Sequence, residues 1–331
     1  MNVLKWSFRA VIFVVLLRAF AKDTVVYQAI APVTEPIFEA CFEQLASLWE
    51  DSTQQNSSNN TKTDNNSKKQ EEVVFLEEED EATYEKVQEP DEILPCESKI
   101  KHVTHQQDWQ DLQNKTFKAK FTVLPQVACQ AESFREKLPE PVSDGSVRDY
   151  YGKVYLQLTK DNKEKMQKIY KTFAKIRETR KLTEKQFAEM VVSYVQSIPY
   201  VLVHPESCTK ARKWGGFFEE YHDEGKECLP EIRFGLTSPS EFIYNLKGDC
   251  DTRSVFLYTV LAHFGYDVAI FVSQTHCMLG INMPAHGDFM KYKGKKYYFW
   301  ETTAKGYAMG VVAPNFKNEV WHFALVRPSK I

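Results

Sequence analysis

The feature that most constrains this chain is a long segment, residues 51–95, that lacks the side chains needed to build a core. Residues 51–70 contain no apolar side chain, and residues 71–95 contain eleven acids against one lysine. Such a segment cannot bury enough apolar surface to offset the conformational entropy lost on folding. We expect a polar and then acidic disordered linker, with a cation-binding or partner-binding tail as the alternative.

The composition excludes several classes of protein. Hydrophobic residues make up 43% of the 331 residues and charged residues 26%, which excludes a polytopic membrane protein and a fully disordered chain. The formal net charge is −3, and without the acidic run the remaining 41 basic and 34 acidic residues give +7. A general nucleic-acid binder would be more basic, so we expect no nucleic-acid partner.

Residues 1–21 have the form of a signal peptide or N-terminal anchor. Lys5 and Arg9 precede the apolar stretch 10–17, and residues 19–21 (Ala-Phe-Ala) offer a small-x-small cleavage site. We expect a secreted or periplasmic, cell-envelope protein. An uncleaved membrane anchor and a helix of a cytosolic protein are the alternatives, although eight apolar residues fall short of the roughly 20 that span a bilayer.

Residues 22–50 are predicted to form an amphipathic helical segment. Between residues 35 and 49, one helical face carries Ile37, Phe38, Cys41, Phe42, Leu45, Leu48 and Trp49. This face is expected to dock on the main domain or on a membrane surface. Membrane association through the N-terminus therefore stays open.

The cysteines are sparse, at positions 41, 96, 129, 208, 228, 250 and 277. Export would permit disulfides. If one cysteine is a free nucleophile, the other six can pair in fifteen ways. Cys208 with Cys228 would close a short loop and is the preferred pair.

Two parts are expected after the linker: a small β-containing subdomain or core extension over residues 96–155, and the main core over 156–331. Alternating side chains predict a strand at 116–124. Apolar spacing predicts a helix over 162–179.

Two further helices are predicted from their caps. Thr183 and Gln186 have the spacing of a capping box, for a helix that runs to about residue 196. Ser238, followed by Pro239, opens a short helical stretch that ends near Leu246.

The last third of the chain predicts a helix followed by strands. The helix covers residues 251–264 and is closed by Gly265. Strands are expected at 268–273, 276–283 and 296–302, the last of them after a tight turn at Lys293-Gly294.

Cys250 lies at the start of that helix, after Gly248 and Asp249. The free N–H groups and partial positive charge of a helix N-terminus favour a thiolate, while Asp249 and Asp251 oppose it. His276 begins a strand 26 residues later, and Glu301 ends another strand 25 residues further on. Such residues can serve as nucleophile, base and orienting group, although each alone also has an ordinary structural reading.

These motifs resemble the transglutaminase-like superfamily. The resemblance lies in residues 248–251 (Gly-Asp-Cys-Asp), the helix ending at Gly265, His276, and residues 297–303 (Tyr-Tyr-Phe-Trp-Glu-Thr-Thr). Residues 195–200 (Val-Gln-Ser-Ile-Pro-Tyr) are similar to the segment before the core in bacterial members. The resemblance covers about residues 160–310 and implies a papain-like α+β fold, with the nucleophile at a helix N-terminus packed on an antiparallel sheet.

The resemblance also implies a Cys-His-Asp triad. By motif position, Cys250 is the nucleophile, His276 the general base and Glu301 the third member. The family usually has aspartate in the third place, so Glu301 departs from the pattern by one methylene. Asp288 is the fallback.

An oxyanion hole is expected beside the nucleophile. The backbone N–H of Cys250 is its first predicted donor. In animal transglutaminases a tryptophan upstream of the cysteine supplies an indole N–H, and the resemblance points to Trp214, 36 residues before Cys250. Tyr200 and Gln196 compete for this role, and a buried structural tryptophan is the alternative reading of Trp214.

The sequence thus predicts an exported thiol enzyme that cleaves an amide or peptide bond of a protein or peptide substrate through a Cys250 thioester. No metal or organic cofactor is expected. Protein-glutamine acyl transfer, as in cross-linking, is one alternative. A catalytically inactive binding or scaffold module on the same fold is the other.

Overall fold

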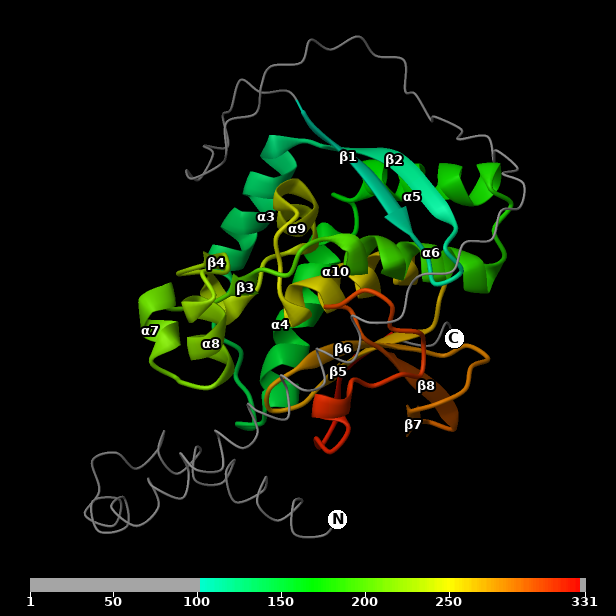
Figure 1. The fold of residues 1–331 in the computed structure, drawn as a ribbon. Coiled ribbons are helices and arrows are strands. Elements are labelled where there is room, and N and C mark those ends of the chain that lie inside the picture. Colours follow the sequence, from blue (N-terminus) through cyan, green and yellow to red (C-terminus); the bar gives the residue numbers. More distant parts are fainter. Residues whose placement is uncertain (1–101, 328–331) are drawn as a thin grey trace, which may run out of the picture. The chain divides into compact units, whose positions relative to one another are not determined.

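The computed structural model describes residues 102–327. The predictions for residues 1–21, 22–50 and 51–95 lie outside the described residues. The chain from Val103 onward contains helices and mainly antiparallel sheets, which confirms the α+β class (Figure 1).

A five-stranded sheet forms one layer. Its strand order is β7-β8-β6-β5-β9, and every neighbouring pair is antiparallel. The strands are β5 (Val268–Val272), β6 (Cys277–Ile281), β7 (Phe289–Tyr292), β8 (Lys295–Trp300) and β9 (His322–Val326). The predicted strands at 268–273, 276–283 and 296–302 and the turn at 293–294 are therefore confirmed to within two residues at most ends.

The two faces of this sheet are covered differently. Successive side chains of a strand point to opposite faces, so Val268, Ile270 and Val272 of β5 belong to the main hydrophobic core, while Ala269 and Phe271 belong to a second cluster. Helices α4 (Val147–Asn162) and α10 (Cys250–His263) pack against strands β5, β6 and β9. Strands β5 and β6 are thus buried on both faces, which explains their near-continuous apolar sequence.

Helix α10 is the predicted helix that begins at the cysteine. Its N-cap is Asp249, whose carboxylate accepts a hydrogen bond from the Thr252 N–H at 3.2 Å. Nearly all of its residues are buried, because it lies between the sheet and helices α6 (Glu184–Ser197) and α9 (Pro239–Asn245). A helix surrounded by protein tolerates apolar residues on every side.

A hairpin covers the other side of this helical layer. Strands β1 (Val103–Gln110) and β2 (Thr116–Val123) pair in antiparallel register and contact α6 and α5 (Gln167–Thr179). Aromatic residues of the hairpin and of the two helices share one core. They are Trp109, Phe117 and Phe121 of the hairpin, Phe173 of α5 and Tyr194 of α6. The predicted boundary at residue 155 falls inside α4.

The helix predictions differ in quality. The predicted capping box of Thr183 with Gln186 forms, and the short helix opened by Ser238 has a second capping box, with Glu241, that was not predicted. The helix predicted over 162–179 begins at Gln167, because residues 163–166 form turns. Helices α3 (Pro125–Lys137) and α4 lack a strong sequence pattern and were not predicted.

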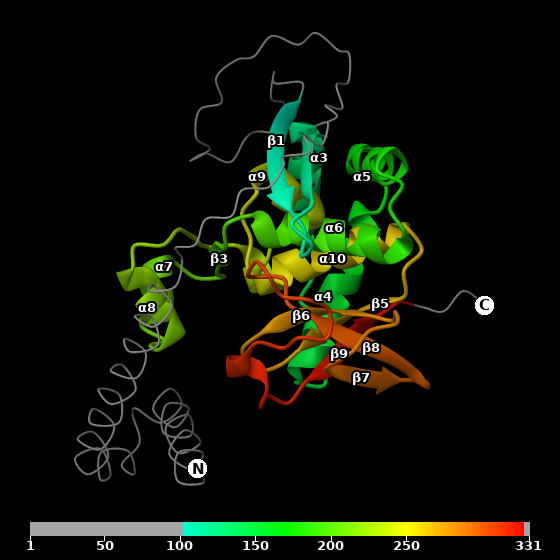
Figure 2. The same ribbon diagram turned by 45° about the vertical axis from the view of Figure 1, so that its right-hand side comes forward.

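Residues 202–229 form a lobe that stands away from the rest of the described structure (Figure 2). It contains β3 (Leu202–Val203), α7 (Cys208–Arg212), α8 (Phe217–Asp223) and β4 (Cys228–Leu229). A disulfide joins Cys208 to Cys228, with a Cα–Cα distance of 6.2 Å. The preferred cysteine pairing is confirmed.

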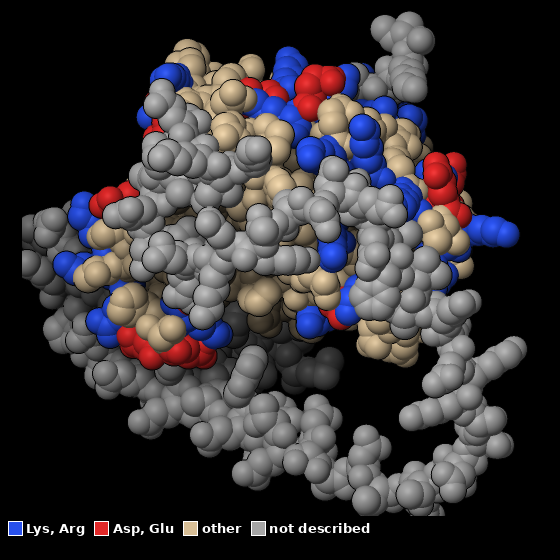
Figure 3. Space-filling model, turned by 90° about the horizontal axis from the view of Figure 1, so that it is seen from above, with Lys and Arg blue, Asp and Glu red and all other residues tan. Residues whose placement is uncertain are grey.

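Basic side chains gather at the hairpin end of the molecule. Lys168, Lys171 and Lys175 of α5 are exposed there, and Figure 3 shows Lys and Arg spread over this face. This distribution agrees with the excess of basic residues outside the acidic run.

Candidate active site

The backbone before Cys250 makes a close approach that requires glycine. A Cβ at Gly248 would lie 2.6 Å from Thr252 Cγ2 and 2.9 Å from Phe242 Cδ2, well inside van der Waals contact. The Gly248 carbonyl accepts hydrogen bonds from Val201 N at 3.3 Å and Arg253 Nε at 2.8 Å. The turn before Cys250 is thus held by the hydrogen bonds to the Gly248 carbonyl and by the close packing at the Gly248 Cα.

The Cys250 thiol is almost buried, with 9% of the residue exposed. Its sulfur lies 3.6 Å from Asp251 Oδ2 and also receives the backbone N–H of Cys277, the residue after His276. Burial, followed by the charges of Asp251 and Asp249, raises the pKa of the Cys250 thiol well above its ordinary value, and the Cys277 N–H opposes this only in part. The resting side chain is therefore a protonated thiol. The effect of the helix N-terminus, which favours a thiolate, is smaller than the effects of burial and of the two aspartates.

The two aspartates beside Cys250 are themselves held in a low-dielectric site. Burial raises the pKa of both carboxyls, and the charge of Asp251 raises the pKa of Asp249 further. The Tyr155 hydroxyl donates a hydrogen bond to Asp251. Helix α4, which carries Tyr155, therefore contacts the nucleophile's surroundings directly.

His276 lies in the turn between β5 and β6. Ser273 Oγ accepts a hydrogen bond from the His276 N–H at 3.0 Å, and the imidazole stacks on Phe316 with ring centroids 4.0 Å apart. Its Nε2 lies 2.9 Å from Glu301 Oε2. Three contacts therefore fix the ring: the backbone hydrogen bond to Ser273, the stacking on Phe316 and the hydrogen bond to Glu301.

Glu301 follows the last residue of β8, which pairs with β6. Its Oε1 accepts hydrogen bonds from Thr302 N, Thr303 N and Thr303 Oγ1 at 2.7–2.9 Å. Burial alone would raise the pKa of Glu301, but the hydrogen bond and charge of His276 and the Thr303 hydrogen bonds hold it below its ordinary value. Glu301 is thus a carboxylate at neutral pH.

This ionisation assigns the tautomer of His276. A carboxylate only accepts hydrogen bonds, so Nε2 of His276 must carry the hydrogen that lies toward Glu301. In the neutral ring, Nδ1 is then left without a hydrogen and can accept a proton.

Arg253 ties the nucleophile helix to the segments around it. It is fully buried, and burial lowers the pKa of its guanidinium to about 10. Its nitrogens donate to five backbone carbonyls at 2.6–3.3 Å: Val195, Ile198, Pro199, Gly248 and Thr302. One cation therefore joins the end of α6, the turn before Cys250 and the residue after Glu301.

Gln196 supports the same corner. Its Nε2 donates to the carbonyl oxygens of Glu301 at 2.7 Å and Tyr307 at 3.0 Å. The Gln196 amide thus holds two backbone carbonyls, one of them that of Glu301. Gln196 is therefore a positioning residue in this structure.

The structure thus brings His276 and Glu301 into contact and places Cys250 against the residue after His276. Asp288, the fallback, is exposed, and its backbone pairs with Gly310 and Phe299. The ring contacts of Trp214 are with His204 and Phe218, so its oxyanion role stays a prediction without support from these contacts.

Tyr200 is the competing donor that lies closer to the chemistry. Arg253 lies over its ring at 5.7 Å, and the charge of Cys250 contributes to its raised pKa. Burial is the main cause of that rise. The Tyr200 hydroxyl therefore keeps its proton at neutral pH.

Sequence reasoning missed two residues of this site. Arg253 stands inside an otherwise apolar helix, and a lone cation there is a readable signal of a buried role. Tyr155 lies on α4, about 95 residues before Asp251 in the chain, and no local pattern connects the two.

Neither models of protein families nor curated proteins or solved structures give a match to this chain. None of the helices between residues 102 and 327 combines the length and apolar character needed to cross a membrane. Within the same range, no three His, Cys, Asp or Glu side chains are grouped so that they could hold a metal ion.

Proposed function

We propose that this protein is a thiol enzyme with a papain-like, transglutaminase-type core that cleaves an amide or peptide bond of a protein or peptide substrate. The observation that carries the proposal is the buried His276–Glu301 hydrogen bond of 2.9 Å beside a thiol at a helix start. The antiparallel sheet with α10 packed on it supports the fold assignment.

In the first step, the Cys250 sulfur attacks the amide carbonyl carbon and His276 Nδ1 takes the thiol proton. The C–N bond then breaks, the amine leaves with that proton, and a thioester remains on Cys250. Because the resting thiol is protonated, proton removal accompanies the attack. Glu301 stabilises the imidazolium that forms.

In the second step, water attacks the thioester carbonyl. His276 takes a proton from the water and returns it to the sulfur as the C–S bond breaks, so a carboxylic acid leaves. The negative oxygen formed in each step would be stabilised by the Cys250 backbone N–H and the Tyr200 hydroxyl. An amine in place of water would give acyl transfer with the same residues.

A catalytically inactive binding module on the same fold is the second candidate. The raised pKa of Cys250 favours it, because a thiol that never ionises does not attack. The two candidates differ in whether His276 can remove the thiol proton.

We also propose that the protein is exported. The signal-like N-terminus supports this, and so does the Cys208–Cys228 disulfide, because disulfides persist mainly in oxidising compartments.

The test is the pH dependence of iodoacetamide alkylation, with Cys250 and Cys277 resolved by mass spectrometry. Both are buried free thiols, so Cys277 serves as the internal control. In His276→Gln the side chain can still donate to Glu301 but is no longer a base. His286→Ala changes an exposed histidine and is the matched control.

The proposal expects Cys250 to react faster than Cys277 and to slow by about 100-fold in His276→Gln, within the range seen for general bases. Cys277 and the His286→Ala protein should be unchanged. Equal, slow labelling of both thiols in every protein would favour the binding module instead.

A further inference from the structure

Two large aromatic side chains are exposed on the lobe. Trp214 is 55% and Phe217 53% exposed, more than the aromatics Phe289 and Tyr292 at the sheet edge, with 38% and 37%. Contiguous apolar surface that is exposed to solvent often marks a site that binds a ligand or a protein partner. The exposure of these two rings therefore suggests that the lobe binds a ligand.

The backbone between the two rings is built to present them. Gly215 and Gly216 both have left-handed φ values, +73° and +53°, and a side chain at either would meet open space. Such φ values are unfavourable for residues with a Cβ. The two glycines therefore form a tight turn that places one aromatic residue at each end.

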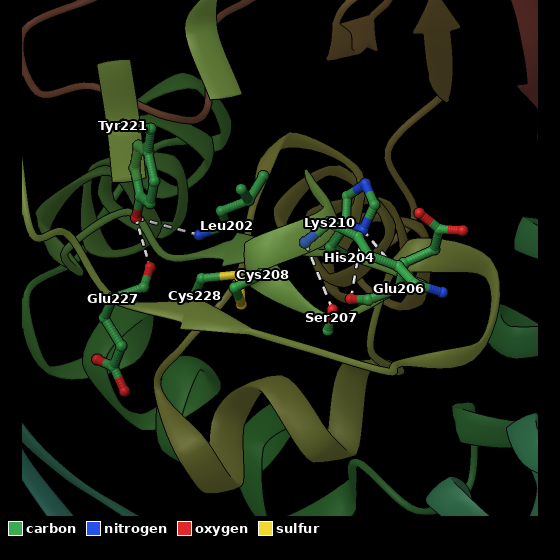
Figure 4. The surroundings of a disulfide bond; sticks show 9 residues. All are labelled: Leu202, His204, Glu206, Ser207, Cys208, Lys210, Tyr221, Glu227 and Cys228. Atoms are coloured by element: carbon green, nitrogen blue, oxygen red, sulfur yellow. Dashed lines mark hydrogen bonds between the residues drawn. A yellow bond between two sulfur atoms is a disulfide. The ribbon is translucent and has the colours of Figure 1, made fainter. Parts of the chain in front are cut away.

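The base of the lobe is rigid. The Tyr221 hydroxyl accepts from Leu202 N at 3.2 Å and donates toward the carbonyl oxygen of Glu227 at 2.7 Å. Figure 4 shows Tyr221 and His204 on either side of the Cys208–Cys228 disulfide. The exposed tip thus stands on a fixed support.

His204 adds a polar group under the tip. Its Nδ1 accepts from the Glu206 N–H at 3.0 Å, so Nε2 carries the ring hydrogen. Nε2 is buried and without a hydrogen-bond partner, and the ring lies edge-on to Trp214 at 4.6 Å between centroids. A buried N–H without an acceptor costs free energy, which an added acceptor at the tip would recover.

The lobe is continuous with the candidate active site. The ring of Phe217 contacts Tyr200, with centroids 6.4 Å apart. Tyr200 in turn lies under Arg253, and the next residue, Val201, hydrogen-bonds to Gly248 two residues before Cys250. One side chain therefore separates the exposed rings from the surroundings of the thiol.

We propose that Trp214 and Phe217 bind an aromatic or large aliphatic side chain of the peptide substrate. The inference rests on the proposed function and names its substrate class. Because the lobe is fixed relative to the candidate site, the recognised side chain lies at one set position along the peptide from the scissile amide. Trp214 acts here in specificity and not as an oxyanion donor.

The test uses peptidyl chloromethyl ketones, which alkylate an active-site thiol with loss of chloride. One set carries a single phenylalanine moved along a run of alanines, and the all-alanine reagent is the reference. Alkylation of Cys250 is followed by mass spectrometry in the full-length protein. Iodoacetamide, which is too small to reach the lobe, reports the intrinsic reactivity of the thiol.

One phenylalanine position should accelerate alkylation about tenfold over alanine, which corresponds to removing roughly 55 Å² of apolar surface from water. The preference should vanish in Trp214→Ala/Phe217→Ala, while the iodoacetamide rate is unchanged. Phe289→Ala, an exposed aromatic on β7, is the matched control and should keep the preference.

Two results would overturn the proposal: no preference at any position, or a preference that survives in the Trp214→Ala/Phe217→Ala protein. Either can occur while iodoacetamide labelling stays dependent on His276, so the proposed function would stand. Loss of that dependence counts against the proposed function itself. Unchanged urea unfolding of the double variant confirms that it folds.

Discussion

The candidate active site, called the centre below, and the lobe are built on opposite principles. His276 and Glu301 are buried, and their polar atoms are held by a hydrogen bond to each other and by Ser273, Thr302 and Thr303 in the segments that follow β5 and β8. The lobe exposes two aromatic rings and is closed by a covalent bond between Cys208 and Cys228. Noncovalent contacts from distant segments position the first, and a short cross-linked loop positions the second.

This difference matches what each region has to do under the proposed function. A triad must hold its atoms within about half an ångström, which requires packing on several sides. A surface that receives a substrate side chain must stay open to solvent, and so it cannot gain stability by burial. A disulfide stabilises such a loop without covering it.

The largest expected effect concerns the carboxylate in the centre. Glu301→Gln replaces an acceptor by an amide whose N–H groups face the N–H donors of His276 or Thr303. We expect the Cys250 alkylation rate at neutral pH to fall by up to about 100-fold, the loss expected when the base itself is removed, because Glu301 acts through His276. The rate is measured by quenching the iodoacetamide reaction at successive times and quantifying alkylated Cys250 by mass spectrometry.

The pH dependence of stability checks the same residue. The pKa of Glu301 is lowered in the folded protein, so its ionised form stabilises the fold above the unfolded-state pKa of about 4.3, and this contribution is lost as pH falls through the lower folded pKa. The difference in unfolding free energy between the wild type and Glu301→Gln should therefore shrink in acid. Asp288→Asn, at the exposed fallback, is the control and should leave rate and stability unchanged.

The next largest effect concerns the buried cation. Arg253→Met would remove a buried donor that five backbone carbonyls share, and we expect a loss of about 3–5 kcal/mol in unfolding free energy. Urea denaturation measures it. Arg148→Met, at an exposed position of α4, should cost little. A loss below 1 kcal/mol for Arg253→Met would show that the centre does not depend on this network.

Local patterns predicted much of the centre. The capping box at Thr183, the short helix that begins after Ser238, the helix after Cys250 and the strands around His276 were predicted from short-range sequence patterns, and each is present in the structure. The link between His276 and Glu301 also followed from chain order, since β6 and β8 pair. The extra methylene of glutamate is accommodated, since Oε1 accepts from the Thr303 backbone and hydroxyl while Oε2 reaches the imidazole.

The rest depended on tertiary contacts that no local pattern encodes. Whether Cys250 is a thiol or a thiolate is decided by burial and by Asp251, and both depend on how α4 and the sheet enclose the helix start. The exposure of Trp214 depends on the left-handed turn at Gly215 and Gly216. Sequence alone suggested a buried or catalytic tryptophan there.

A smaller effect is expected in the lobe. Replacing both Cys208 and Cys228 by serine reopens a loop with a sequence separation of 20, which the loop-entropy model values at about 3 kcal/mol. We expect trypsin to cut within residues 208–228, while Cys250 labelling keeps its His276 dependence. Cys277→Ser makes the same substitution at a free buried thiol and should leave the lobe resistant. Resistance of the double variant would mean that noncovalent contacts suffice.

The smallest effect separates the electrostatic from the structural role of the helix cap. Asparagine caps a helix about as well as aspartate, so Asp249→Asn keeps the start of α10 and removes one of the charges that raise the pKa of Cys250. The pH profile of Cys250 alkylation should move to lower pH, with a several-fold faster rate at neutral pH. Asp144→Asn, at an exposed aspartate, is the control.

Stability gives an independent reading of the same change. The pKa of Asp249 is raised in the folded protein, so the folded state holds its proton longer, and wild-type stability falls as pH rises from the unfolded-state value of about 3.9 toward the folded pKa. In Asp249→Asn the unfolding free energy does not decrease with pH in this way. The variant should therefore be as stable as the wild type at neutral pH, or more stable. A faster thiol in a protein of undiminished stability would show that the charge beside Cys250 restrains its reactivity and is not needed to build the helix. An unchanged alkylation profile would assign the raised pKa to burial alone.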